Sequence, residues 1–393
     1  MEYYFLFLLL FLALVAVFDI FVGVSNDAVN FLNSALGCRI ASFKTVMIVA
    51  SLGVMLGATF SSGMMEIARS GVFNPQMFTF SEIMVIFFAV MVTDIILLDA
   101  FNSLGLPTST TVSIVFELLG SALAAAAYTL MLDGASLADV AQYINSSRSL
   151  TIVSGILISV VVAFVSGTVV QYIARLIFTF NFEKVYRRVG GVYAGFCLTA
   201  IFYFLVMKGA KGASFMQPEW IQYMDANTWP IVTGLFVILS IVFQILIVAM
   251  SVNIFKVVIL AGTFSLAFAF AGNDLVNFVG VPLAAWDSYK EWSAAAIAPE
   301  LFTMEGLLKP TVAATGFLLF AGLVMVLTLW FSKKAQIVIQ TSINLSSSNS
   351  GEQEQFGSSM PGRMIVRASM GLGRVIHQII PMSVQKGIDQ RFE

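Results

Sequence analysis

The feature that most limits how this chain can fold is a polar motif inside a long apolar run. Asn26, Asp27 and Asn30 follow a nearly unbroken apolar segment that starts at Tyr3. Because residues three and four positions apart lie on one face of a helix, the three side chains face the same way. A carboxylate and two amides at bilayer depth are costly unless something binds them, which makes them candidate site residues. The alternative is a hydrogen-bonded cluster that only joins helices.

The motif occurs again in the second half of the chain. Asn273, Asp274 and Asn277 repeat it behind another apolar run, 257–270. Two copies of a costly motif predict a duplicated unit, which is a common plan in secondary transporters. The repetition favours a binding site over a cluster that only joins helices.

Composition predicts a membrane protein built from helices. Of the 393 residues, 59% are hydrophobic and 11% are charged, against roughly 25% charged in soluble proteins. We expect an all-α polytopic membrane protein, because several apolar runs can cross a bilayer core of ~30 Å. The expected membrane segments are 3–33, 44–63, 80–102, 104–129, 150–178, 190–210, 230–252, 256–280 and 311–331. One histidine (His377) and two widely spaced cysteines (Cys38 and Cys197) offer little for metal or histidine chemistry, so we expect no enzyme and no organic cofactor.

Lys and Arg in the loops predict the orientation. The loop 179–189 and the tail from Ser332 are rich in both residues, so both should be cytoplasmic. Counting segments then places the N-terminus outside, together with the loops 130–149 and 284–310. The same count makes the two motif-bearing helices run in opposite directions, as in an inverted repeat. We therefore expect a multi-pass protein of the cell (inner) membrane.

A break in the apolar region 80–129 predicts a helical hairpin. Gly105 loosens the backbone, and Pro107 has no N–H and disfavours helix before it. The hydroxyl residues that follow are typical of a helix start: Ser109, Thr110 and Thr111. A re-entrant hairpin with its tip here would point free N–H groups and hydroxyls at one place and form an anion cradle. An ordinary tight turn between two full spans is the alternative.

Four more acidic residues lie in apolar surroundings: Asp19, Asp94, Asp99 and Glu117. Each could be a cation ligand, a proton carrier or a residue near a helix end that reaches water. For Asp99 we favour the last role, because it is close to the hairpin tip. The other three stay unassigned.

The combination of an anion cradle with an acidic core predicts coupled transport. The middle of each predicted span lacks Arg, so the core would repel an anion unless cations bound with it. Carboxylate, amide and hydroxyl oxygens are the ligands of hard cations. We therefore expect cation-coupled symport of a small oxyanion, since bound cations would make anion affinity depend on them.

The expected organisation has four parts. These are a first transmembrane repeat at 1–178 with the re-entrant hairpin near 80–129, connecting transmembrane helices at 179–255, the start of a second, inverted repeat at 256–331, and a cytoplasmic loop and tail at 332–393. Within the tail, 346–359 reads as a flexible loop. Residues 361–388 alternate basic and apolar side chains, which fits an amphipathic helix at the inner membrane surface or a solvated basic tail.

At these motifs the chain resembles the inorganic phosphate transporter (PiT) family. That family carries a Gly-Ala-Asn-Asp-Val-Ala-Asn type motif in each half, similar to 25–30 and 272–277 here. It also carries a Pro-Val-Ser-Thr-Thr-His motif at a re-entrant hairpin, similar to 107–111. The resemblance covers residues from about 10 to 340 and implies uptake of inorganic phosphate, coupled to Na⁺ or H⁺, by alternating access.

The resemblance also implies roles for individual residues. Phosphate would be bound by Ser109, Thr110, Thr111, Asn30 and Asn277. The coupling cation would be bound by Asn26, Asp27, Asn273 and Asp274, with the two aspartates as Na⁺ ligands. The family further suggests a homodimer in the lipid bilayer, and we expect no nucleic-acid partner.

The chain departs from the family pattern in two ways. Val112 stands where the family often has His, so no role for that histidine carries over. After Asp274 no second Ser-Thr-Thr hairpin follows, and Ser332–Leu345 looks like the cytoplasmic segment that precedes it in the family. We therefore expect a chain truncated before the second hairpin.

Other functions remain open from the sequence. The transported oxyanion could be sulfate instead of phosphate, because the motifs do not separate tetrahedral oxyanions. A membrane-embedded lipid phosphotransferase would usually need clustered carboxylates with Arg or His at the interface. A channel or a non-transporting phosphate sensor would give a flux that is independent of the cation gradient.

Overall fold

The computed structural model describes residues 2–61, 69, 71–179, 182–208, 216–309, 313–346 and 359–392. Within these ranges the regular elements are helices, accompanied by two isolated β-bridges. Seven helices are long and apolar enough to cross a membrane, or eight if a bent pair counts as one span. The chain is therefore an all-α polytopic membrane protein, as predicted.

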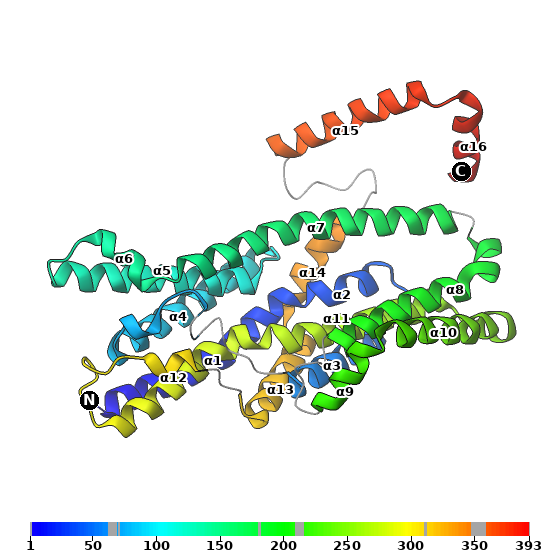
Figure 1. Ribbon diagram of the computed structural model, residues 1–393. Helices are drawn as coiled ribbons and strands as arrows, with labels where there is room; N and C mark the ends of the chain where they lie inside the picture. The colour runs from blue at the N-terminus through cyan, green and yellow to red at the C-terminus, as the bar shows by residue number, and fades with distance from the viewer. Residues whose placement is uncertain are drawn as a thin grey trace.

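Two long apolar helices, each broken at a polar motif, form the centre of the molecule (Figure 1). The first is α1 (Glu2–Asp27) continued by α2 (Val29–Gly37), and the second is α11 (Ile254–Asn273) continued by α12 (Leu275–Ala295). Because α1 packs on α12 while α2 packs on α11, the two run antiparallel. This is the direction that an inverted repeat requires, and the repeat itself stays a prediction.

A helical hairpin lies along α1. Its arms are α4 (Phe80–Leu104) and α5 (Thr110–Leu132). The first arm ends at Gly105, whose φ of 69° is a left-handed conformation that favours glycine. The second arm begins after Ser109, whose hydroxyl accepts a hydrogen bond from the Val112 amide. The predicted helix break and helix start are thus confirmed.

Close backbone contacts attach a shorter apolar helix, α3 (Phe43–Thr59), to α11. The contact is made where α3 carries glycines four residues apart, Gly53 and Gly57. A Cβ at Gly57 would lie 2.2 Å from the Phe268 carbonyl oxygen. Such a close approach is possible only with small residues at the interface.

The segment after Ser332 differs from the prediction of a loop. Helix α13 (Thr315–Phe331) is followed by α14 (Lys333–Ser346) at an angle of 67°. Helix α14 packs on α1, α2 and α4, and Val338 on it is fully buried. The segment expected to be a cytoplasmic loop therefore begins with a helix that packs in the core. Apolar residues at helical spacing give α14 an apolar face that packs against its neighbouring helices.

Two other expected loops are partly helical. Residues 284–295, expected in an outside loop, belong to α12, because Ala284, Ala285, Ser288 and Trp292 form one buried face despite nearby charges. In the 179–189 loop, the basic residues lie in the first turns of α8 (Glu183–Phe202).

The remaining elements flank or connect these helices. They are α7 (Ser146–Phe178), a π-helical turn (Tyr203–Lys208), α9 (Pro218–Ala226), α10 (Thr228–Met250) and the short elements Pro75–Met77, Leu137–Asp139, α6 (Val140–Tyr143) and Glu305–Leu308. Helices α8 and α10 pack against each other. The tail forms α15 (Met360–Ile379) and α16 (Met382–Phe392), so the helix predicted over 361–388 is interrupted at Ile380 and Pro381, and its place at the membrane surface stays a prediction. Most of the loop 346–359 lies outside the described residues.

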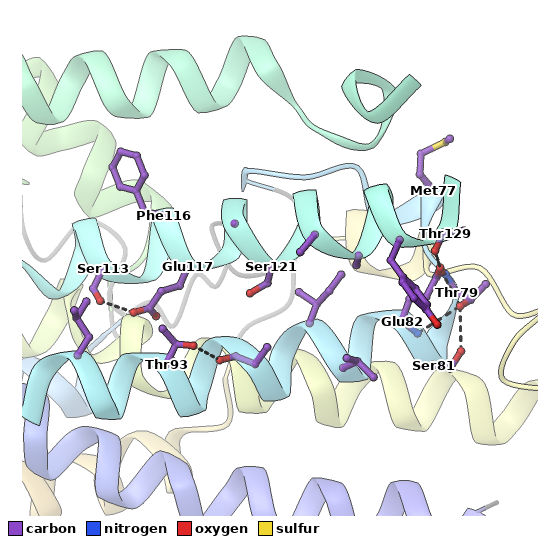
Figure 2. Close-up of a pocket in the computed structure, with 18 of the residues that line it drawn as sticks. Met77, Thr79, Ser81, Glu82, Thr93, Ser113, Phe116, Glu117, Ser121 and Thr129 are labelled. Carbon is purple, nitrogen blue, oxygen red and sulfur yellow. Dashed lines mark hydrogen bonds between the residues drawn. The ribbon is translucent and has the colours of Figure 1, made fainter. Parts of the chain in front are cut away.

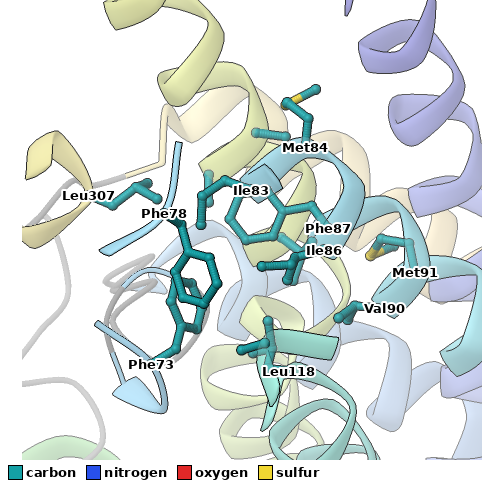
Figure 3. Close-up of a cluster of buried hydrophobic side chains, with 14 of the residues drawn as sticks. Phe73, Phe78, Ile83, Met84, Ile86, Phe87, Val90, Met91, Leu118 and Leu307 are labelled. Carbon is teal, nitrogen blue, oxygen red and sulfur yellow. The ribbon is translucent and has the colours of Figure 1, made fainter. Parts of the chain in front are cut away.

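Two large hydrophobic clusters fill the bundle. One joins the N-terminal part of α1 to the hairpin and to the C-terminal part of α12, and it includes the residues of Figure 3, such as Phe78 and Phe87. The other joins the motif-bearing part of α1 to α2, α3, α11, α13 and α14. On α1 the first cluster ends at Ala16 and the second begins at Ile20. The polar residues described next are thus enclosed by apolar packing.

Candidate functional site

The hairpin tip is held to α1 by a buried asparagine. Asn26, which is fully buried, donates through Nδ2 to Asn102 Oδ1 (2.8 Å) and to the Leu106 carbonyl (3.0 Å). Its Oδ1 accepts from the Thr108 amide (2.7 Å). Asn102 in turn donates to the Val22 carbonyl (2.8 Å). The Asn26 amide therefore satisfies the irregular backbone of the tip, which could not be left unpaired in a membrane interior.

The first aspartate meets the first turn of α5. Asp27 is 3% exposed, and its Oδ2 accepts from Thr110 Oγ1 at 2.9 Å. Its Oδ1 accepts from Asn30 Nδ2 at 3.3 Å, while Asn30 is itself exposed. The first motif and the hairpin thus form one polar cluster.

The second aspartate meets the same turn from the other side. Asp274 Oδ1 accepts from Thr111 Oγ1 at 3.4 Å, and Thr111 Oγ1 accepts from Asn277 Nδ2 at 2.9 Å. Because Thr110 and Thr111 are adjacent, the two aspartates approach the same turn of α5. Two carboxylates in an apolar bundle, surrounded by amide and hydroxyl oxygens, form a donor set suited to a hard cation.

Hydrogen-bond donors are also present at this point. The N–H groups of Thr110 and Thr111 belong to the first turn of α5, whose N–H groups have no carbonyl partner within the helix. Ser109 caps that helix and is exposed, so its O–H can still donate. A helix N-terminus with such donors favours an anion. The site therefore combines groups for an anion with groups for a cation.

The structure brings together all but one of the predicted site residues in a connected cluster. The exception is Asn273, whose side chain is exposed, whereas its counterpart Asn26 holds the hairpin tip. Their predicted roles in ion or phosphate binding stay predictions.

Sequence reasoning missed two parts of this region. Asn102 has a visible signal, since it is an amide near the end of an apolar run. Ser332, at the bend between α13 and α14, lies 2.6 Å from Ser25 through the two hydroxyl oxygens. Its partner comes from a distant part of the chain, so the sequence alone gives no sign of the contact.

A groove of about 1360 Å³ leads to the hairpin tip (Figure 2). It runs along α4 and α5, from Glu82, Asp133 and Glu300 at one end to Thr108 and Ser109 at the other. Most of its lining is apolar.

These features define a class of protein. Apolar helices that can cross a membrane, two antiparallel broken helices and a hairpin tip placed at both breaks are typical of a membrane transporter. The phosphate transporter family model matches residues 23–340, and the chain belongs to that family. The resemblance seen in the motifs is thereby confirmed, together with the expectation of a transporter instead of an enzyme.

The fold has a solved counterpart. A structure described as "The sodium-dependent phosphate transporter" is similar with a TM-score of 0.58 and 17% sequence identity. The similarity covers 86% of this chain and 82% of that chain. No curated protein sequence matches the chain. The comparison shows a shared fold.

Proposed function

We propose that the chain is a cation-coupled symporter of inorganic phosphate. One observation carries the proposal: adjacent threonines at one helix N-terminus donate hydrogen bonds to the aspartates of both motifs. Thr110 contacts Asp27, and Thr111 contacts Asp274. Groups suited to an anion and groups suited to a cation thus lie on one helix turn and are hydrogen-bonded to each other. An ion bound by one set therefore changes the affinity of the other set for its ion. Family membership and the sodium-dependent relative support phosphate and Na⁺ as the ligands.

The anion would be bound by neutral donors. These are the first N–H groups of α5, the Ser109 hydroxyl and the amides of Asn30 and Asn277. Phosphate beside Asp27 and Asp274 would meet strong repulsion in a low-dielectric interior. A Na⁺ ion or a proton on the two carboxyls removes that repulsion, which is the physical basis of coupling. Sulfate fits the same donors, so it belongs in the tests as a competitor.

Alternating access would use the two broken helices. In this proposal the chain lies in the cell membrane with its N-terminus outside and its tail in the cytoplasm, and it works as a homodimer. The antiparallel course of α1–α2 and α11–α12 supports an inverted repeat whose two parts move against each other around the site.

The proposal is tested in proteoliposomes that contain the chain. We expect phosphate uptake that requires an inward Na⁺ or proton gradient and that excess sulfate does not abolish. Asp27→Asn and Asp274→Asn should each reduce uptake about tenfold to a hundredfold, as expected when a ligand loses one charged hydrogen-bonding partner. Both variants should keep their fold, because an amide oxygen still accepts from the threonine.

The matched control is Asp99→Asn. Asp99 is partly exposed and pairs with Lys334, with Oδ1 and Nζ 2.5 Å apart. It lies outside the proposed site, so this variant should transport normally. Full phosphate uptake by both site variants would refute the assignment of the cation site, and uptake independent of any cation gradient would indicate a channel.

A further inference from the structure

Three carboxyl groups lie where α1, α4 and α5 approach one another, about two helical turns along α1 from Asp27. They belong to Asp19, Asp94 and Glu117, and we call them the acidic triad. Asp19 and Asp94 are both 0% exposed, and Glu117 lines the groove between α4 and α5. Asp19 is seven residues before Asn26, which places the two on one face of α1 two turns apart.

Hydrogen counting at Ser113 indicates that Asp94 and Glu117 hold a proton between them. Ser113 Oγ lies 2.6 Å from Asp94 Oδ1 and 2.7 Å from Glu117 Oε1. Both distances are those of good O–H···O hydrogen bonds, but a hydroxyl has only one proton to donate. Ser113 can donate to one carboxylate, and the other contact then requires a protonated carboxyl that donates to Ser113.

Asp19 gives a second, independent observation. Neither of its carboxyl oxygens receives a hydrogen bond from an N–H or hydroxyl group among the described residues, although the side chain is fully buried. Its carboxyl faces that of Asp94 and is close to that of Glu117. Two ionised carboxylates in contact at a buried position repel strongly, so a pair in this geometry shares a proton. One oxygen each of Asp94 and Glu117 is also without a partner in the described part of the chain.

Positive charge from neighbouring helices does not neutralise the triad. On α1, the next acid towards the hairpin tip is Asp27. On α12, Asp287 is paired with Arg69 at 2.8 Å, and on α14 the Lys334 ammonium is paired with Asp99. Helix α13 carries no ionisable side chain. Among the described residues no group of three or more acidic, His or Cys side chains has the geometry of a metal site.

The groove gives protons a route to the triad (Figure 2). Its outer end is acidic, with Glu82, Asp133 and Glu300. The hydroxyl residues Ser121 and Thr93 line it between that end and Glu117, and it continues to Ser109 at the hairpin tip. Water held by these hydroxyls can pass a proton from the acidic end to Glu117.

We propose that the acidic triad is a proton-binding site, filled through the groove along α4 and α5 and separate from the Asp27–Asp274 cluster. A proton from water joins a carboxylate oxygen, and no other bond changes. The number of protons on the triad sets the charge near the hairpin tip. Ser113, which contacts two of the three carboxyl groups, follows Thr110 by three residues on α5, or about one helical turn. The effect on transport rests on the proposed function, whereas proton binding does not.

The first experiment reads protonation directly. Infrared spectra of the purified full chain at neutral pH should contain a carbonyl-stretch band from protonated, buried carboxyls. Asp94→Asn and Glu117→Gln should each reduce this band, and the double variant should reduce it further. Asp99→Asn is the matched control and should leave the band unchanged, because Asp99 is ion-paired and partly exposed. A spectrum without this band, or a band that both variants leave intact, would overturn the proposal. A shift of the carboxylate bands on adding Na⁺ that Asp94→Asn abolishes would overturn it in favour of a Na⁺ site.

The second experiment separates this proposal from the proposed function. If phosphate uptake or binding needs one proton on the triad, it should decrease as that proton is lost. The decrease should be about tenfold per pH unit above the pH range in which the triad is protonated. Glu117→Gln, which mimics the neutral form, should flatten that pH profile while Na⁺-dependent phosphate binding at neutral pH is kept. If no phosphate is bound or moved but the infrared result holds, the proposed function fails and the proton site stands. An unchanged pH profile in Glu117→Gln would remove the link between the triad and transport.

Discussion

The role of Asn26 gives the sharpest test of the site. One buried and two partly buried hydrogen bonds join its amide to the hairpin tip. At about 0.6–1.5 kcal/mol for each bond, Asn26→Ala should weaken attachment of the tip by about 1.8–4.5 kcal/mol. That free energy corresponds to an increase of roughly 20-fold to 2000-fold in the fraction of molecules with a detached tip.

Hydrogen exchange measures this fraction directly. The amides of Val112 and Ser113 keep their Ser109 acceptors in Asn26→Ala, so their exchange reports detachment of the tip and should accelerate by roughly that factor. Phosphate binding should weaken as well, since only molecules with an attached tip present the intact site. The control is Asn273→Ala, the same change in the second motif. Asn273 is exposed, so stability should change by no more than about 0.5 kcal/mol.

The result that would refute this reasoning is specific. Our sequence prediction makes Asn26 a cation ligand, whereas the structure shows its amide engaged with the tip. If Asn26→Ala leaves exchange at Val112 and Ser113 unchanged in Na⁺-free solution and only weakens Na⁺ binding, Asn26 acts as a ligand and does not hold the tip.

Two further substitutions test the packing. Gly57→Ala should destabilise the chain by about 1–3 kcal/mol, because its Cβ would collide with the α11 backbone. The control Gly262→Ala places its Cβ in open space and should be neutral. Thermal unfolding in detergent compares the two variants, and equal melting temperatures would contradict the close contact. Asp287→Ala should cost about 3–5 kcal/mol because it leaves a buried guanidinium without its ion-pair partner. Lys290→Ala removes only the exposed partner of the same carboxylate and should cost at most about 1 kcal/mol; equal losses would show that the buried pair contributes little.

Much of the fold follows from local sequence. The apolar runs determine the helices, because a bilayer or an apolar core accepts such runs only with their backbone paired internally. Gly105 and Pro107 fix the break between α4 and α5, since they act on the backbone of their own and neighbouring residues. The polar motifs mark the place where α1 and α11 end.

Charge patterns were less reliable for element boundaries. Charged residues between 284 and 295 suggested a loop, but α12 continues there with one buried face. The segment after Ser332 begins with two lysines, yet its apolar face packs into the bundle and Lys334 reaches Asp99. A charge on one side of a helix does not prevent burial of the other side, and only neighbouring helices decide which side is covered.

The sequence by itself determined the helices, their breaks and the set of polar residues, because these depend on neighbours along the chain. Only the tertiary structure decided which polar residues meet: Thr110 with Asp27, Thr111 with Asp274, and Ser113 with two acids of the triad. It also made Asn26 buried and Asn273 exposed, although the two residues occupy equivalent positions in the two motifs. A hydrogen bond needs a partner at a defined distance and angle, and these partners come from segments far apart in the chain.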